Sequence, residues 1–108
     1  MGAAFPLTYT TAVVLQALAH GYRYGFDIMD ATGLPSGTVY PILRRLERRR
    51  LVGSKWEKEA AAFREQRPPR RYYELTAAGA ETCAEALRRF RGLERAQPAL
   101  PGAGPTPA

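Results

Sequence analysis

The stretch SGTVYPILRRLERRRLV at residues 36–52 constrains the fold most, because it places five arginines among regularly spaced aliphatic residues. At about 100° per residue, the aliphatic residues share one arc of a helix: Val39, Ile42, Leu43 and Leu46. The opposite arc carries a different set: Gly37, Tyr40, Pro41, Arg44, Arg45 and Arg48. A buried arginine without a partner is very costly, so the sequence predicts an amphipathic helix whose basic arc faces solvent or a ligand.

The start of this helix is predicted at Ser36, because serine is a favourable N-cap residue. Pro41 then lies about one turn into the helix, where a missing N–H costs less than at mid-helix, since several N–H groups near a helix start are unpaired anyway. The N–H groups and hydroxyls of Ser36, Gly37 and Thr38 also suit a phosphate, in addition to any capping role.

The rest of the chain predicts a small number of further elements. In chain order these are helices at residues 8–20 and 24–33, strands at 51–57 and 70–76, and a last helix at 77–96. The connector between the strands is long and charged, and its residues 60–64 favour a local helical turn. The predicted fold class is therefore mainly α with a small β-hairpin.

The last predicted helix carries an apolar stripe at three- and four-residue steps: Ala80, Cys83, Leu87 and Phe90. Packing on the chain's own domain would cover this stripe, but a helix that follows such a compact unit more often pairs with its twin in a dimer. We therefore expect dimerisation here. Residues 97–108 consist mainly of Pro, Gly and Ala without periodicity, which predicts a disordered tail.

The charge balance indicates an anionic partner. Lys and Arg outnumber Asp and Glu by 16 to 10, which gives a net charge of +6 and a pI near 10.0. A single cysteine forms no intramolecular disulfide, so a reducing cytoplasm is the expected compartment. No apolar run approaches the length of a membrane span or a signal peptide, so we expect a soluble protein without membrane contact.

Enzyme chemistry has little basis in this sequence. His20 is the sole histidine, and no second His or Cys lies near it in a metal-ligand spacing. The sequence has no Gly-rich phosphate loop and no paired carboxylates in an apolar setting. We therefore expect no catalysis, no metal and no cofactor.

Four blocks of the sequence resemble, in order, the PadR family of bacterial transcriptional regulators. They are YGFDI (24–28), TVYP (38–41), RLE (45–47) followed by LV (51–52), and RPPRRYYELTAAG (67–79). The resemblance covers roughly residues 7–92. The predicted order of three helices, a hairpin and a helix is also that of a winged helix-turn-helix domain with an appended helix.

The resemblance implies a homodimeric repressor of the short class, which has a single C-terminal helix. Residues 1–75 are then the winged helix-turn-helix DNA-binding domain, and residues 76–96 form the dimerisation helix. The third helix enters the major groove of a palindromic operator, and the hairpin, or wing, touches the DNA backbone or minor groove. The DNA-contacting residues expected on this basis are Ser36, Gly37, Thr38, Tyr40, Pro41, Arg44, Arg45, Arg48, Arg64, Arg67 and Arg70.

The chain departs from the family pattern at three positions. Arg50 and Gln66 stand where the family usually has glycine, and Pro69 is additional. Some short members bind flat aromatic drugs through a tryptophan between their dimerisation helices, whereas the only tryptophan here is Trp56 in the predicted hairpin.

Two other functions remain open. The basic helix face of a winged-helix interaction module would dock an acidic protein partner instead of DNA. A small-molecule effector bound at the dimer interface is compatible with DNA binding. For Trp56, Tyr72 and Tyr73, the two interpretations are packing within the hairpin and an aromatic ligand site.

Overall fold

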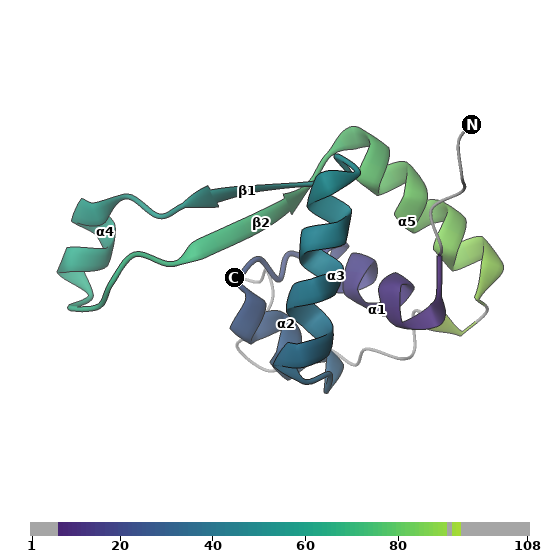
Figure 1. Ribbon diagram of the computed structural model, residues 1–108, viewed down its shortest axis with the longest axis horizontal. Helices are drawn as coiled ribbons and strands as arrows, with labels where there is room; N and C mark the ends of the chain where they lie inside the picture. The colour runs from purple at the N-terminus through teal and green to yellow at the C-terminus, as the bar shows by residue number, and fades with distance from the viewer. Residues whose placement is uncertain (1–6, 91, 94–108) are drawn as a thin grey trace.

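The computed structural model describes residues 7–90, 92 and 93 of the chain. The elements are α1 (Tyr9–Ala19), α2 (Gly25–Thr32), α3 (Ser36–Arg48), β1 (Val52–Trp56), α4 (Glu59–Arg64), β2 (Arg71–Leu75) and α5 (Ala77–Arg89). Four helices form a body, and the hairpin of β1 and β2 projects from it with α4 at its tip (Figure 1). The predicted fold class is confirmed, including the helical turn within the connector.

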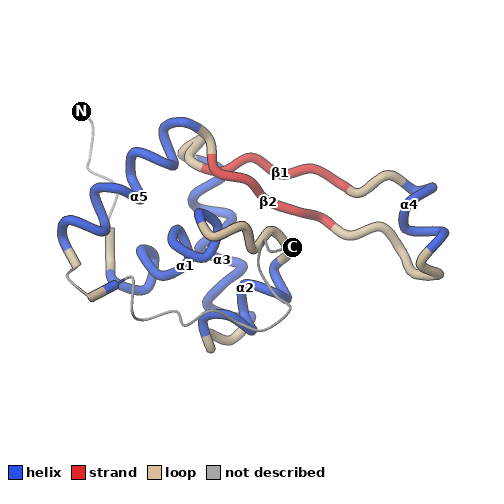
Figure 2. Tube along the Cα trace, turned by 180° about the vertical axis from the view of Figure 1, so that it is seen from behind, coloured by secondary structure: helices blue, strands red, loops and turns tan. Residues whose placement is uncertain are grey.

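Helix α1 lies at the centre of the body (Figure 2). Its eight consecutive residues from Thr11 to Leu18 are all buried, because α2, α3, α5 and β2 pack around it. The hydroxyl of Thr8 caps the helix by accepting a hydrogen bond from the Thr11 N–H at 3.1 Å. Burial on all sides explains why this helix shows no clear amphipathic pattern.

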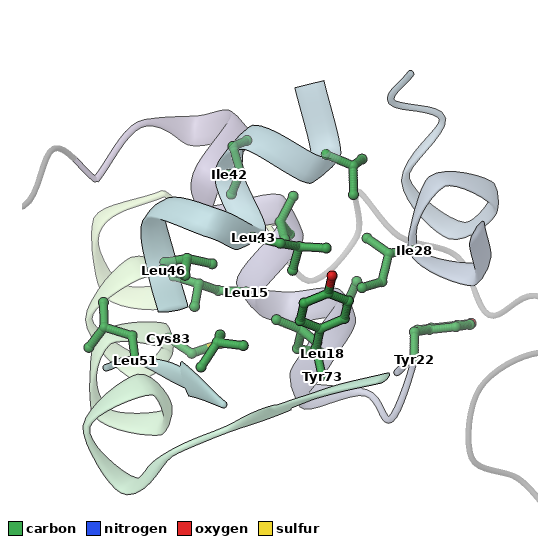
Figure 3. Packing of buried hydrophobic residues seen from close by; sticks show 14 of the residues in the cluster. Leu15, Leu18, Tyr22, Ile28, Ile42, Leu43, Leu46, Leu51, Tyr73 and Cys83 are labelled. Carbon is green, nitrogen blue, oxygen red and sulfur yellow. The ribbon is translucent and has the colours of Figure 1, made fainter. Parts of the chain in front are cut away.

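The predicted apolar arc of α3 is confirmed as part of the core. Val39, Ile42, Leu43 and Leu46 are all buried. They pack with Leu15, Leu18, Ile28, Tyr73 and Cys83 from four other elements (Figure 3). Full burial of an aliphatic side chain contributes about 1.5–3 kcal/mol, so this cluster fixes the orientation of α3 on the body.

The predicted N-cap of α3 is wrong by one residue. Pro35 occupies the cap position, and its carbonyl accepts hydrogen bonds from the N–H groups of Thr38 at 2.9 Å and Val39 at 3.0 Å. The proline ring already holds φ near −76°, which fits the extended conformation of a cap residue. Ser36 is therefore the first helical residue rather than the cap.

Helix α5 is shorter than predicted, because it ends at Arg89 and Phe90 turns to an extended conformation. Residues 91, 94–96 and the predicted tail at 97–108 lie outside the described residues. At its start, Thr76 caps the helix as expected, since its hydroxyl accepts the Gly79 N–H at 3.0 Å.

The apolar stripe of α5 is divided between the core and the surface. Cys83 is only 4% exposed and packs in the chain's own core, where burial raises the pKa of its thiol, so its assignment to a dimer contact is wrong. Phe90 is half-buried and lies edge-on to the ring of Tyr9, with 5.6 Å between the ring centroids. Ala80 and Leu87 remain exposed.

Among the described residues, two that are not glycine have a left-handed backbone: Arg50 at φ 60° and Gln66 at φ 58°. Both stand where the resemblance predicts glycine. The chain thus keeps the backbone conformation that glycine favours, at the cost of strain from a Cβ atom.

The strand register sorts the hairpin side chains onto two sides. The strands are antiparallel, with Ser54 opposite Tyr73 and Trp56 opposite Arg71. Opposed residues share a side of the sheet, and successive residues alternate. We call the side with Ser54, Trp56, Arg71 and Tyr73 the α3 side, because α3 contacts it. The other side carries Lys55 and Tyr72, and we call it the Tyr24 side, because Tyr24 forms a β-bridge with Tyr72.

Candidate nucleic-acid interface

The basic arc of α3 points away from the core, as predicted. Arg44 and Arg48 are exposed and lie one turn apart, while Arg45 is half-buried. Among the described residues, no carboxylate forms an ion pair with these three arginines. Their guanidinium groups are therefore available to an external anion.

The first turn of α3 lies beside this arc. Ser36 and Gly37 are exposed, and Thr38 is half-buried. Apart from the chain of its own helical turn, no described heavy atom lies within 4 Å of the position that a Cβ on Gly37 would take, so the backbone is open there. The first N–H groups of a helix have no acceptor within it, which leaves this end suited to a phosphate.

Tyr40 combines packing with exposure. It is half-buried and packs against the core, and its ring lies so close to Gly25 of α2 that a Cβ there would overlap it. The same side chain lines the surface between α3 and the hairpin. The prediction that Tyr40 lies outside the core is therefore only partly right. Pro41 is half-buried beside it.

A hollow of about 490 Å³ lies between α3 and the hairpin, and we call it the α3–wing hollow. Six residues line it: Tyr40, Arg44, Glu47, Arg48, Arg71 and Tyr73. Three guanidinium groups face one carboxylate, so the hollow carries an excess of positive charge. Of its arginines, only Arg71 is absent from the sequence-based site.

Arg71 is held in place by α3. Its Nη2 donates to both carboxylate oxygens of Glu47 at 3.2 Å, and its Nε donates to the Ser54 hydroxyl at 3.0 Å. Ser54 in turn donates to Glu47 at 2.6 Å. Glu47 therefore fixes the hairpin to the helix. Arg71 could have been assigned to this site from the sequence, because side chains alternate along a strand. It lies two residues before the buried Tyr73 and therefore on the same side of the sheet.

Arg67 and Arg70, both predicted as DNA contacts, lie instead around Glu57. The carboxylate of Glu57 accepts from Arg67 Nη2 at 3.0 Å, from the Arg70 N–H at 2.9 Å and from the Tyr24 hydroxyl at 2.9 Å. The Arg70 guanidinium also lies over the Tyr24 ring, 3.8 Å from its centroid. We call these four residues the Glu57 cluster; they attach the outer hairpin to the start of α2.

The electrostatics of the Glu57 cluster follow from this geometry. Hydrogen bonds hold the pKa of Glu57 well below its usual value; those from Arg67 have the largest effect, and those from Arg70 and Tyr24 have smaller ones. Burial, with the nearby Glu57 carboxylate, raises the pKa of Tyr24. The charges of Arg67 and Arg70 are thus engaged within the protein, in contrast to those of Arg44 and Arg48.

The tip of the hairpin is exposed. Arg64, in the last turn of α4, has an exposed side chain, as its predicted contact with DNA requires. Phe63 beside it is 80% exposed, and Trp56 further in is 64% exposed. Of the two interpretations given for the hairpin aromatic residues, packing therefore fits Tyr73, which is buried, and Tyr72, which lies edge-on to Tyr24, but not Trp56.

Two classes of site find no support in the part of the chain that the structure describes. No group of three or more His, Cys, Asp or Glu side chains gathers to hold a metal ion. No described helix is long and apolar enough to cross a membrane.

Three helices followed by a two-stranded hairpin, with exposed arginines along the third helix, define a winged helix-turn-helix protein. A family model described as the transcriptional regulator PadR-like family matches residues 14–85, which is more than half of the chain. The chain therefore belongs to the PadR-like transcriptional regulators, which are not enzymes. A search of curated proteins gave no match.

Solved structures share this fold. A PadR family regulator from Clostridium difficile R20291 is 24% identical, with a TM-score of 0.67, over 82% of this chain and 93% of that one. A PadR-like transcription factor from Bacteroides fragilis is 26% identical, with a TM-score of 0.58, over 81% and 86%. BpsR of Bordetella bronchiseptica, whose DNA binding is regulated by 6-hydroxynicotinic acid, is 25% identical, with a TM-score of 0.67, over 83% and 60%.

Proposed function

We propose that this chain is a sequence-specific regulator that binds duplex DNA, acts as a repressor and works as a homodimer on a palindromic operator. The observation that carries the proposal is the row of exposed arginines on α3, which lack ion-pair partners among the described residues and adjoin the positive α3–wing hollow. Membership of a transcriptional regulator family supports it. Such a protein works in the bacterial cytoplasm, at its DNA.

The recognition step is assigned to α3. The major groove of B-DNA admits an α-helix, and an arginine donates two hydrogen bonds to O6 and N7 of guanine. Arg44 and Arg48 extend from one side of α3 and suit this role, and Arg45 suits a phosphate at the groove edge. Ser36, Gly37 and Thr38 bind a phosphate at the helix start, where the helix dipole favours negative charge.

The other predicted contact residues are assigned smaller roles: two on α3 shape its surface, and the arginine at the wing tip attracts the DNA backbone. Tyr40 and Pro41 shape the surface that α3 offers to the groove. We expect Arg64 to contribute more to the attraction for the DNA backbone than Arg67 and Arg70, because the latter two already bind Glu57.

The dimer contact is assigned to the exposed side of α5. Ala80 and Leu87 lie on that side, and both are exposed, Leu87 to 40%, so both are accessible to a second copy of the chain. A two-fold dimer places two α3 helices in successive major grooves, about 34–36 Å apart. The likeness to BpsR supports a small effector that shifts DNA affinity, as a second part of the proposal.

Selection from a random duplex library, followed by fluorescence anisotropy at physiological salt, tests the proposal. We expect a palindromic consensus, bound at least about 10³-fold more tightly than a shuffled duplex of the same composition. Equal, weak and salt-sensitive binding to both duplexes would contradict the proposal. It would favour the alternative, in which the basic face docks an acidic protein, and a pull-down would then identify that partner.

A further inference from the structure

Trp56 is unusual because it is a large, exposed aromatic residue on the side of the hairpin that faces α3. Its indole is 64% exposed. The register places it opposite Arg71, in the row that also contains Ser54 and Tyr73. This row begins at the buried Val52 and the half-buried Leu75, runs past the α3–wing hollow, and ends at Trp56.

Arg71 links Trp56 to the hollow. Its guanidinium carbon lies 6.0 Å from the centroid of the Trp56 ring and 5.9 Å from that of Tyr73. Glu47 and Ser54 bind its Nε and Nη2 atoms, whereas Nη1 forms no hydrogen bond with the described residues and the side chain remains 43% exposed, so this guanidinium can still donate to a further anion. The structure therefore presents a fixed cation beside an uncovered indole ring.

We propose that Trp56 and Arg71 form a second contact with the DNA duplex bound by α3: Arg71 binds a backbone phosphate, and Trp56 packs on the neighbouring deoxyribose at the minor-groove edge. This inference rests on the proposed DNA binding by α3 and adds two residues that the sequence did not assign to the site. The contact positions the wing on the strand that flanks the major groove.

The chemistry of the two side chains suits a sugar–phosphate backbone. A guanidinium donates to phosphate oxygens in a fixed fork, and Glu47 has already restricted its orientation. An indole offers a large, rigid apolar surface with little conformational entropy to lose. Along a DNA strand, negatively charged phosphates alternate with uncharged deoxyribose rings, which present C–H groups. A cation beside an aromatic ring matches this alternation: the cation binds the phosphate, and the ring packs on the sugar.

The surrounding charge favours DNA over other partners. Arg44 and Arg48 line the same hollow from α3, so three arginines and the indole follow one continuous path from α3 to the wing. A backbone strand carries regularly spaced negative charges along such a path. Most protein–DNA hydrogen bonds go to phosphates and sugars, and they fix the register of the protein on the duplex.

Trp56 is the only tryptophan in the chain, so its fluorescence reports this contact directly. The selected duplex is titrated into the protein while Trp56 emission, acrylamide quenching and the anisotropy of labelled DNA are recorded. We expect the emission to change and the quenching to fall over the same DNA concentrations at which the anisotropy rises.

Variants measure the contribution of each side chain. We expect Trp56→Ala to weaken specific binding by about tenfold and Trp56→Phe to restore part of that loss, because a smaller ring still packs on the sugar. Arg71→Gln should lower the slope of log K against log salt concentration by about 1, which corresponds to one lost phosphate contact. Lys55→Gln is the matched control, because it removes a charge from the Tyr24 side of the same hairpin and should leave that slope unchanged.

The outcomes separate this inference from the proposed function. If the wild-type protein binds its duplex specifically while Trp56 emission stays constant, or if Trp56→Ala binds with wild-type affinity, the Trp56 contact is overturned and DNA binding by α3 stands. If Arg71→Gln and Lys55→Gln give the same slope, the phosphate contact of Arg71 is overturned. If the wild-type protein prefers no duplex, the proposed function fails, and this inference fails with it.

Discussion

The helical body and the hairpin are stabilised in different ways. In the body, eight consecutive residues of α1 are buried, and the apolar arc of α3 packs on them. In the outer hairpin, large aromatic rings are exposed, and carboxylates carry the contacts: Glu47 holds Arg71, and Glu57 holds Arg67 and Arg70. We therefore expect changes in the body to alter stability and most changes on the exposed arginine surface to alter only binding.

The largest expected effect lies where the body meets the hairpin. A Cβ on Gly79, in the first turn of α5, would overlap the backbone carbonyl of Leu51 just before β1. Backbone does not yield as a flexible side chain does, so we expect Gly79→Ala to lower the free energy of unfolding by about 3 kcal/mol. Urea denaturation followed by circular dichroism measures this loss.

Gly37→Ala is the matched control for that substitution. Gly37 also lies in the first turn of a helix, but no described atom outside that helical turn lies within 4 Å of the position that its Cβ would take. Alanine favours a helix by up to about 1 kcal/mol over glycine, so we expect no destabilisation. A similar loss in both variants would show that the close approach of α5 to Leu51 does not control stability.

The second prediction concerns binding alone. Arg44 is exposed on α3 and has no ion pair within the described part of the chain, so Arg44→Ala should weaken specific DNA binding by about 1–3 kcal/mol. Its free energy of unfolding should stay within about 0.5 kcal/mol of wild type. Anisotropy and urea denaturation of the same preparation test both statements.

Arg88→Ala provides the control for Arg44→Ala. Arg88 is also exposed, but it lies on α5 and pairs with Glu85. Its removal should leave operator affinity nearly unchanged. Equal losses in the two variants would indicate that only net charge matters and that α3 has no special position on the DNA.

The sequence predicted what local periodicity determines. The spacing of Val39, Ile42, Leu43 and Leu46 was sufficient to assign the buried arc of α3, which is confirmed. On the opposite arc Arg44 and Arg48 are exposed as predicted, but Tyr40 also packs against the core. Periodicity does not say which element covers a stripe, and for this reason Cys83 was assigned to a dimer contact although α1 and the core already cover it.

The roles of the wing arginines depended on contacts distant in sequence. Arg70 and Arg71 are neighbours, yet one binds Glu57 and the other binds Glu47, because the antiparallel register fixes their partners. That register and the position of α3 arise only when the chain has folded. Composition therefore indicated a basic wing but could not separate the arginines held by the Glu57 cluster from the one beside the α3–wing hollow.

The third prediction concerns the strained end of α3. Relief of the left-handed conformation of Arg50 is worth about 1–2 kcal/mol, and the added freedom of glycine in the unfolded chain offsets about 0.4–1 kcal/mol of it. Arg50→Gly should therefore raise the free energy of unfolding by slightly less than about 1 kcal/mol. Arg50→Ala keeps the strain and should give no such gain; equal stabilisation by both would mean that the side chain, not the backbone, is unfavourable.

The smallest global effect is expected from Glu57→Gln, because the Glu57 cluster secures the outer hairpin, which can open without unfolding the body. At neutral pH the change should lower the protection from hydrogen exchange of the backbone amide at position 57, which donates to Arg70 O at 2.8 Å, and leave the Leu15 amide in α1 unaffected. Glu74→Gln, which removes a carboxylate from an exposed ion pair with Arg23, is the control and should change little.

The pH dependence of this difference follows from the lowered pKa of Glu57. A carboxyl group with a lowered pKa contributes stability that is fully present above its ordinary value of 4.5 and is lost as the pH falls through its lower value in the folded protein. The difference between wild type and Glu57→Gln in the protection of the position-57 amide from hydrogen exchange should therefore be constant above about pH 4.5 and shrink below it. A difference that grew on acidification would mean that the protonated carboxyl, rather than the carboxylate, holds the hairpin on the body.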